Sequence, residues 1–146
     1  MNVLVWYENR PLPEHAEAER RVYPNGIHGE LSALFAAQPG IQARAATMQD
    51  AQQGLSDEAL AWADVLVYFS HKHWREIDDG RVDAIQRRVL EGMGLVALHS
   101  AHASKIFQRL MGTRTHQIHW RENDEWQRVW VVNPAHPIAA GLTDES

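Results

Sequence analysis

The sequence predicts an α/β domain with a mostly parallel sheet, and two observations point to this fold class. Apolar runs over residues 2–7, 64–69 and 95–98 have the length of strands that are buried on both faces. Segments with apolar residues at helical spacing separate these runs. Strands that alternate with helices form βαβ units with right-handed crossovers, so the strands run parallel. We expect a single domain over residues 1–146, because a chain of this length can bury one core.

Two strands and two helices are expected in the first half of the chain. Asn2 to Tyr7 is a β-branched and aromatic run that ends in the polar sequence ENRP, which predicts a buried strand. A long loop should follow, up to a helix from about His28 to Gln38. Ile41 to Thr47 alternates weakly, as edge strands do, and Ser56 begins a short helix that ends near Trp62.

Three strands and two helices are expected in the second half. The sequence DVLVYF from Asp64 to Phe69 predicts a buried parallel strand, and Leu95 to Leu98 predicts the next one. A charged helix with an apolar stripe should span about Asp78 to Glu91, where glycines stop it. Lys105 to Met111 is helical in character, and Arg128 to Val132 predicts a further strand.

Composition excludes several classes of function. The chain has no cysteine, so it has no disulfide framework, thiolate zinc site or cysteine nucleophile. Its net charge of -5 gives no basic field, so neither nucleic acid nor an anionic membrane is an expected partner. No apolar stretch has the length of a signal peptide or membrane span, and a cytoplasmic location is expected.

Candidate site residues follow the three clearest strands. In open parallel sheets, ligands bind outside the carboxyl ends of the strands. The loops at these ends begin at Glu8, Ser70 and His99, and His28 opens the helix that returns from the first of them. Histidine, carboxylate and hydroxyl groups must therefore carry any chemistry at this edge of the sheet.

Three segments resemble the ThuA-like (trehalose utilisation) family. They are GIHG at 26–29, QRRVLEGMGLVALHSAHASKIFQRLMGT at 86–113 and VVNPAHPIAAG at 131–141. The resemblance implies a flavodoxin-like, three-layer, doubly wound sheet related to class I glutamine amidotransferases, and a link to the catabolism of trehalose or similar disaccharides. Family members usually continue further, so we expect this chain to lack the C-terminal part of the fold. An exposed sheet edge would then favour homo-oligomers.

The same resemblance places an unusual residue at the nucleophile position. The amidotransferase relatives carry a cysteine at an elbow where a strand turns sharply into a helix. Here that position is His99 or Ser100, so glutamine hydrolysis through a thiolate is excluded. The family also commonly has a Gly-His pair after the third clear strand and another His three residues later. This chain has Ser70-His71 there, with Trp74 in place of the second His and His73 beside it.

These residues suggest a histidine-lined pocket with two alternative kinds of chemistry. Imidazole nitrogens of His28, His71 and His99 can bind Zn²⁺ or another divalent metal, and no nucleotide cofactor is indicated. Alternatively His71 and His99 move protons near neutral pH, and His102 lies close to them in sequence. Ser100 could act as a nucleophile only if a histidine served as its base and a carboxylate oriented that histidine.

A small-molecule carbohydrate is the expected partner. Glu8, Asn9, Trp74 and His102 are candidates to bind it through hydroxyl contacts or ring stacking. The plain alternative is that such polar residues only solvate loops and such aromatic residues belong to the core. The first functional hypothesis is an enzyme, a sugar isomerase, hydrolase or lyase, acting on a disaccharide or its keto derivative. The alternative is a non-catalytic carbohydrate-binding or assembly module.

Overall fold

The computed structural model describes residues 1–113, 123–126 and 129–142 and contains a four-stranded parallel sheet. The strand order is β2-β1-β3-β4, with β1 (Asn2–Tyr7) and β3 (Val65–Phe69) in the centre. The edges are β2 (Gln42–Thr47) and β4 (Gly94–Leu98). The chain winds outward in both directions from β1, which is the doubly wound, flavodoxin-like arrangement that was expected.

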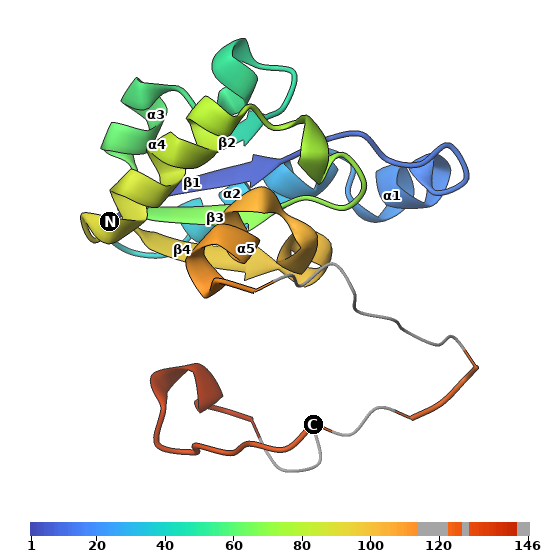
Figure 1. The fold of residues 1–146 in the computed structure, drawn as a ribbon. Helices are drawn as coiled ribbons and strands as arrows, with labels where there is room; N and C mark the ends of the chain where they lie inside the picture. The colour runs from blue at the N-terminus through green and yellow to red at the C-terminus, as the bar shows by residue number, and fades with distance from the viewer. Residues whose placement is uncertain (114–122, 127–128, 143–146) are drawn as a thin grey trace.

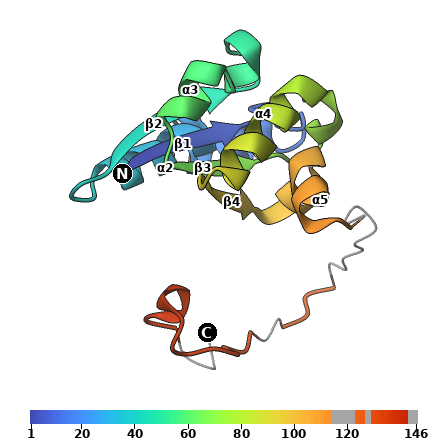
Figure 2. The ribbon, with the colours of Figure 1, turned by 60° about the vertical axis from the view of Figure 1, so that its left-hand side comes forward.

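Helices cover both faces of the sheet and make three layers (Figures 1 and 2). One face carries α3 (Asp57–Trp62), α4 (Asp79–Leu90) and α5 (Lys105–Met111), which pack on a core that includes Leu4 and Leu66. The other face carries α2 (Gly26–Ala36), whose side chains pack on Val3, Val5 and Val67. Side chains of β1 alternate between the two cores, so this strand is buried on both faces.

Residues at the helix starts explain where two of the helices begin. The Ser56 hydroxyl accepts a hydrogen bond from the backbone N–H of Ala59, and Ser104 accepts one from that of Phe107. Each cap satisfies one of the N–H groups that the first turn of a helix leaves unpaired. α5 ends at Gly112, which has a left-handed backbone conformation, with φ at 67°.

Two large aromatic residues of the central strands lie in the core. Trp6 and Tyr68 face each other across β1 and β3, with ring centroids 4.5 Å apart, and both are buried. The indole N–H of Trp6 donates to the backbone carbonyl of Gln53 at 2.7 Å. Burial raises the pKa of Tyr68 well above its ordinary value.

The predicted elements agree with the structure at most positions, and the loop between β1 and α2 is the main exception. α1 (Ala16–Val22) forms where only a loop was expected, and α2 (Gly26–Ala36) begins two residues earlier than expected. α1 has no buried residue. A helix without an apolar stripe gives no periodic signal, so this helix could not be recognised from its pattern.

The strand predicted over Arg128 to Val132 is wrong where the structure describes it. Arg128 lies outside the described residues, and residues 129–132 form no strand. Trp130 and Val132 are 67% and 95% exposed, and the described sheet has no strand beyond β4. A β-branched run becomes a strand only when a neighbour pairs with it, so its composition alone was insufficient. Within the described residues, no helix is both long and apolar enough to cross a membrane.

Candidate active site

The carboxyl ends of β1, β3 and β4 bring the predicted site residues to one edge of the sheet. A small cavity of about 160 Å³ opens there, and His71 and His99 both line it. The centroids of their rings are 6.4 Å apart. The remaining lining residues come mainly from the end of β1, the following loop and α1, and they are Tyr7, Arg10, Pro11, Leu12, His15, Glu19, Ile27 and Phe69.

His99 occupies the sharp turn at the end of β4. Its φ is 45°, in the left-handed region that non-glycine residues rarely adopt. The chain enters a 3-10 helix at this residue, and Ser100 and Ala101 behind it are buried. This is the conformation of a nucleophile elbow, which projects one side chain above the sheet. Of the two residues expected at the elbow, the structure therefore assigns the position to His99.

Two hydrogen bonds of Ser100 determine which nitrogen of His71 carries the proton. The Ser100 hydroxyl donates to the backbone carbonyl of Ser70 at 3.2 Å, and its oxygen lies 2.8 Å from Nδ1 of His71. A hydroxyl has one proton, so both contacts are made only if Nδ1–H of His71 donates to Ser100. The lone pair of the neutral ring is then on Nε2. Ser100 thus orients His71 and is itself buried.

The surroundings of His71 favour the neutral ring. Burial lowers its pKa below the ordinary value, and the nearby Lys72, His99 and His15 act in the same direction, while the charge of Glu8 opposes them. A neutral imidazole with a free Nε2 can accept a proton at pH 7. The lowered pKa therefore favours the neutral form of His71.

Glu8 anchors the loop that carries His71. Its side chain is fully buried, and its carboxylate accepts three hydrogen bonds, from the Ser70 hydroxyl at 3.0 Å and from the backbone N–H groups of Lys72 at 2.9 Å and His73 at 3.0 Å. These bonds tie the loop after β3 to the end of β1. Glu8 was expected to bind sugar, but its full burial leaves no surface that a ligand could reach.

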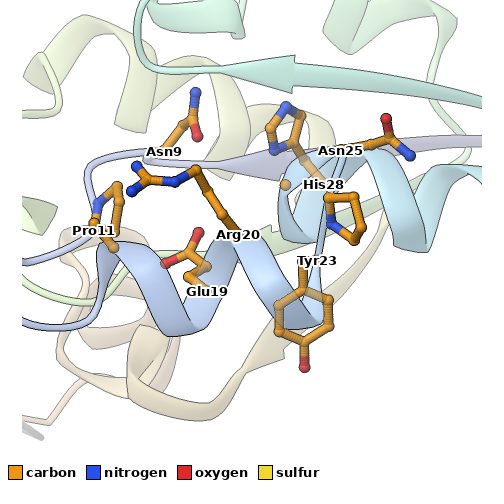
Figure 3. Close-up of a pocket in the computed structure, with 10 residues that line it drawn as sticks. Asn9, Pro11, Glu19, Arg20, Tyr23, Asn25 and His28 are labelled. Carbon is orange, nitrogen blue, oxygen red and sulfur yellow. The ribbon is translucent and has the colours of Figure 1, made fainter.

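A larger cavity of about 410 Å³ lies beside the small one (Figure 3 shows the residues that line the larger cavity). Both cavities include Pro11 and Glu19 in their walls. Ligand sites in proteins commonly have volumes of about 300–1,000 Å³. The walls come from the loop after β1, from α1 and from the start of α2, and the other lining residues are Asn9, Ala16, Arg20, Tyr23, Pro24, Asn25, Gly26 and His28.

Residues 2–146 match the family model ThuA, which is described as trehalose utilisation. The chain belongs to the ThuA family. Its role is therefore in trehalose utilisation in general terms. No curated protein matches the chain.

The other site residues predicted for this ThuA-family protein lie apart from the small cavity. His73 pairs through Nδ1 with Glu76 at 2.6 Å. Nδ1–H of His102 donates to the backbone carbonyl of His99 at 3.1 Å, which supports the turn. Trp74 is half-buried, and the guanidinium of Arg75 lies 4.6 Å from its ring centroid.

His28 and Asn9 line the larger cavity. Nδ1 of His28 is buried and has no hydrogen-bond partner among the residues that the structure describes, and burial lowers the pKa of the ring. The ring packs against Gly26, and its centroid lies 6.0 Å from that of Tyr7. Asn9 has φ at 48°, so the chain turns away sharply after β1.

Within the described residues, the three histidines proposed as metal ligands do not form a metal site. No group of three or more His, Asp or Glu side chains there is arranged to hold a metal ion. His71 and His99 line the small cavity, whereas His28 lines the larger one.

Sequence reasoning missed the contributions of α1 and of Tyr7. Glu19 and Arg20 line cavities because α1 folds over the end of β1. The Tyr7 hydroxyl donates to Glu19 at 3.2 Å, and burial raises the pKa of Tyr7. The only available signal was the end position of Tyr7 in its strand, because the helix itself was not predicted.

Proposed function

We propose that this chain is an enzyme that acts on trehalose, a related disaccharide or a keto derivative of one, with the small cavity as its reacting centre. The family description, trehalose utilisation, supports a substrate of this class. The observation that carries the enzymatic proposal is the hydrogen bond from Nδ1–H of His71 to Ser100, because it leaves Nε2 as a base. His99 on its strained turn faces the same cavity.

The two histidines suit a proton transfer next to a carbonyl group. A carbonyl carbon makes a proton on the neighbouring sugar carbon acidic. Nε2 of His71 takes that proton, and the electron pair of the C–H bond moves toward the carbonyl oxygen. A ring N–H of His99 donates to this oxygen and stabilises the developing negative charge. For an isomer, the proton of the hydroxyl on the deprotonated carbon moves through the His99 ring to the former carbonyl oxygen, and Nε2–H of His71 returns the carbon-bound proton to the former carbonyl carbon. For an elimination, the carbonyl re-forms as the C–O bond on the next carbon breaks, and Nε2–H of His71 protonates the leaving oxygen.

A non-catalytic sugar-binding module is the second candidate. One observation favours it: the elbow carries an imidazole in place of the thiol that the related amidotransferases use, and the chain has no cysteine. Under this proposal the elbow histidine only contacts a bound sugar. The two candidates differ in whether a sugar C–H bond is broken.

Deuterium exchange distinguishes the two candidates. A keto derivative of trehalose is incubated with the protein in D₂O, and NMR measures the loss of the signal from the carbon next to the carbonyl. His71→Asn is the informative variant, because its side-chain N–H₂ can replace the donor to Ser100 while Nε2 is lost. Loss of a general base should slow exchange about 10²-fold or more.

The control for this experiment is His136→Gln, which changes an exposed histidine that lines neither cavity. It should exchange at the wild-type rate. Equal exchange rates in wild type and His71→Asn would contradict the catalytic role of His71. Binding of the keto sugar without any exchange in the wild type would favour the binding module.

A further inference from the structure

The larger cavity adjoins the reacting centre, and its position suggests a second part of the same binding site. Pro11 and Glu19 belong to the walls of both cavities. Glu19 is held at this boundary, because its carboxylate accepts the hydroxyl of Tyr7, which lines the small cavity. A molecule with two linked rings would place its linkage beside Glu19, with one ring on each side.

The lining of the larger cavity has the groups that a sugar ring requires. Sugars are bound by planar polar side chains that hydrogen-bond to hydroxyls, together with an aromatic surface for the apolar face of the ring. Arg20 and Asn9 supply donors, and Figure 3 shows the Arg20 side chain extending toward Asn9 and Pro11. Tyr23 is 39% exposed and supplies the aromatic surface.

Arg20 is available for a ligand. Across the described residues, its guanidinium makes no hydrogen bond or ion pair, whereas Arg10 and Arg81 each pair with a carboxylate. The neighbouring residue of α1, Arg21, lines neither cavity. The two arginines therefore form a natural pair of test and control positions with the same charge on the same helix.

We propose that the larger cavity is the subsite for the second ring of a two-ring sugar, whose first ring occupies the small cavity over His71 and His99. This inference rests on the proposed function. Arg20 donates hydrogen bonds to hydroxyls of the second ring, Asn9 contributes a further polar contact, and the ring's apolar face lies on Tyr23. The pair of cavities thereby selects a disaccharide over a single sugar.

The test compares the affinities of trehalose and glucose, measured by calorimetry with the full chain. The readout is the ratio of the two affinities in wild type, Arg20→Ala and Arg21→Ala. Trehalose should bind about tenfold tighter than glucose in wild type, because one good charge-assisted hydrogen bond contributes about this factor. Arg20→Ala should reduce the ratio to about one, and Arg21→Ala should leave it at the wild-type value.

Three results would overturn the subsite. A ratio of about one in wild type means that no second ring is held. An unchanged affinity ratio in Arg20→Ala means that Arg20 does not contact the second ring. An equal decrease of the ratio in Arg20→Ala and Arg21→Ala means that only the positive charge of α1 affects binding. If neither sugar nor the keto derivative binds to wild type, the proposed function fails together with the subsite. Arg20 is exposed, so Arg20→Ala should fold, and urea unfolding checks this.

Discussion

Replacing Glu8 by glutamine tests whether the buried carboxylate anchors the loop that carries His71. The carboxylate accepts three hydrogen bonds, two through Oε2 and one through Oε1 from the backbone N–H of Lys72. A glutamine that keeps its oxygen at the Oε2 position turns its N–H₂ group toward the Lys72 N–H. Two donors then face each other in a fully buried site.

The expected loss follows from these three bonds. A hydrogen bond to a charged group contributes about 1.5–3 kcal/mol, and leaving a buried donor without a partner costs about 1–3 kcal/mol. Losing the Lys72 bond and weakening the other two should therefore lower the free energy of unfolding by about 4 kcal/mol. That is a large part of the roughly 5–15 kcal/mol that domains typically have, about a quarter of it at the upper end and about four-fifths at the lower end.

Urea unfolding followed by circular dichroism measures the loss, and amide hydrogen exchange localises it. Protection of the Lys72 and His73 amides should fall further than that of amides in β1. Glu14→Gln is the control, because Glu14 is exposed and its change should stay within about 0.5 kcal/mol. A loss below about 1 kcal/mol in Glu8→Gln, with both loop amides still protected, would refute the anchoring role.

Three further predictions concern His28, His71 and the exposed C-terminal residues. Gly26→Ala should lower the unfolding free energy more than Gly40→Ala does. Both glycines have a positive φ, but only at Gly26 would the new Cβ collide with a side chain, 2.6 Å from the His28 ring. The NMR signals of His28 should therefore shift in Gly26→Ala and stay unchanged in Gly40→Ala. Burial lowers the pKa of His71 in the folded chain. As the pH falls, the unfolded chain therefore takes up a proton on His71 at a higher pH than the folded chain does. We therefore compare the difference in unfolding free energy between wild type and His71→Asn. This difference should be constant above the pKa of an unfolded histidine, about 6.5, and should fall as the pH decreases from there toward the lower pKa of the folded state. Urea unfolding at a series of pH values checks this, and a difference that rises on acidification would contradict it. Trp130→Ser should change the unfolding free energy by less than about 0.5 kcal/mol, and a loss above about 2 kcal/mol would show that this residue is packed after all.

The site could be predicted from the sequence only in part. His99 and His71 were predicted to lie together because each closely follows a buried strand and the carboxyl ends of parallel strands meet at one edge, and the structure places both in the wall of one cavity. The orientation of His71 depends on Ser100, which is 29 residues away in the chain, and the loop around it depends on Glu8, which is 62 residues from Ser70. Such pairings leave no pattern in a local stretch of sequence. Glu8 was therefore assigned to a ligand, whereas its partners are the Ser70 hydroxyl and two backbone amides of the loop.

The sequence by itself determined the α/β class, the strands β1, β3 and β4, the helix Lys105–Met111 and the absence of thiol chemistry, because apolar runs, helical periodicity and composition are local properties. Tertiary structure alone decided that α1 forms beside two cavities and that residues 129–132 form no strand. It also decided that His99 takes the strained elbow position and that His28 lines a different cavity from His71. The physical reason is that a strand needs a neighbour, a strained residue needs surrounding contacts that hold it, and a cavity needs walls from several elements.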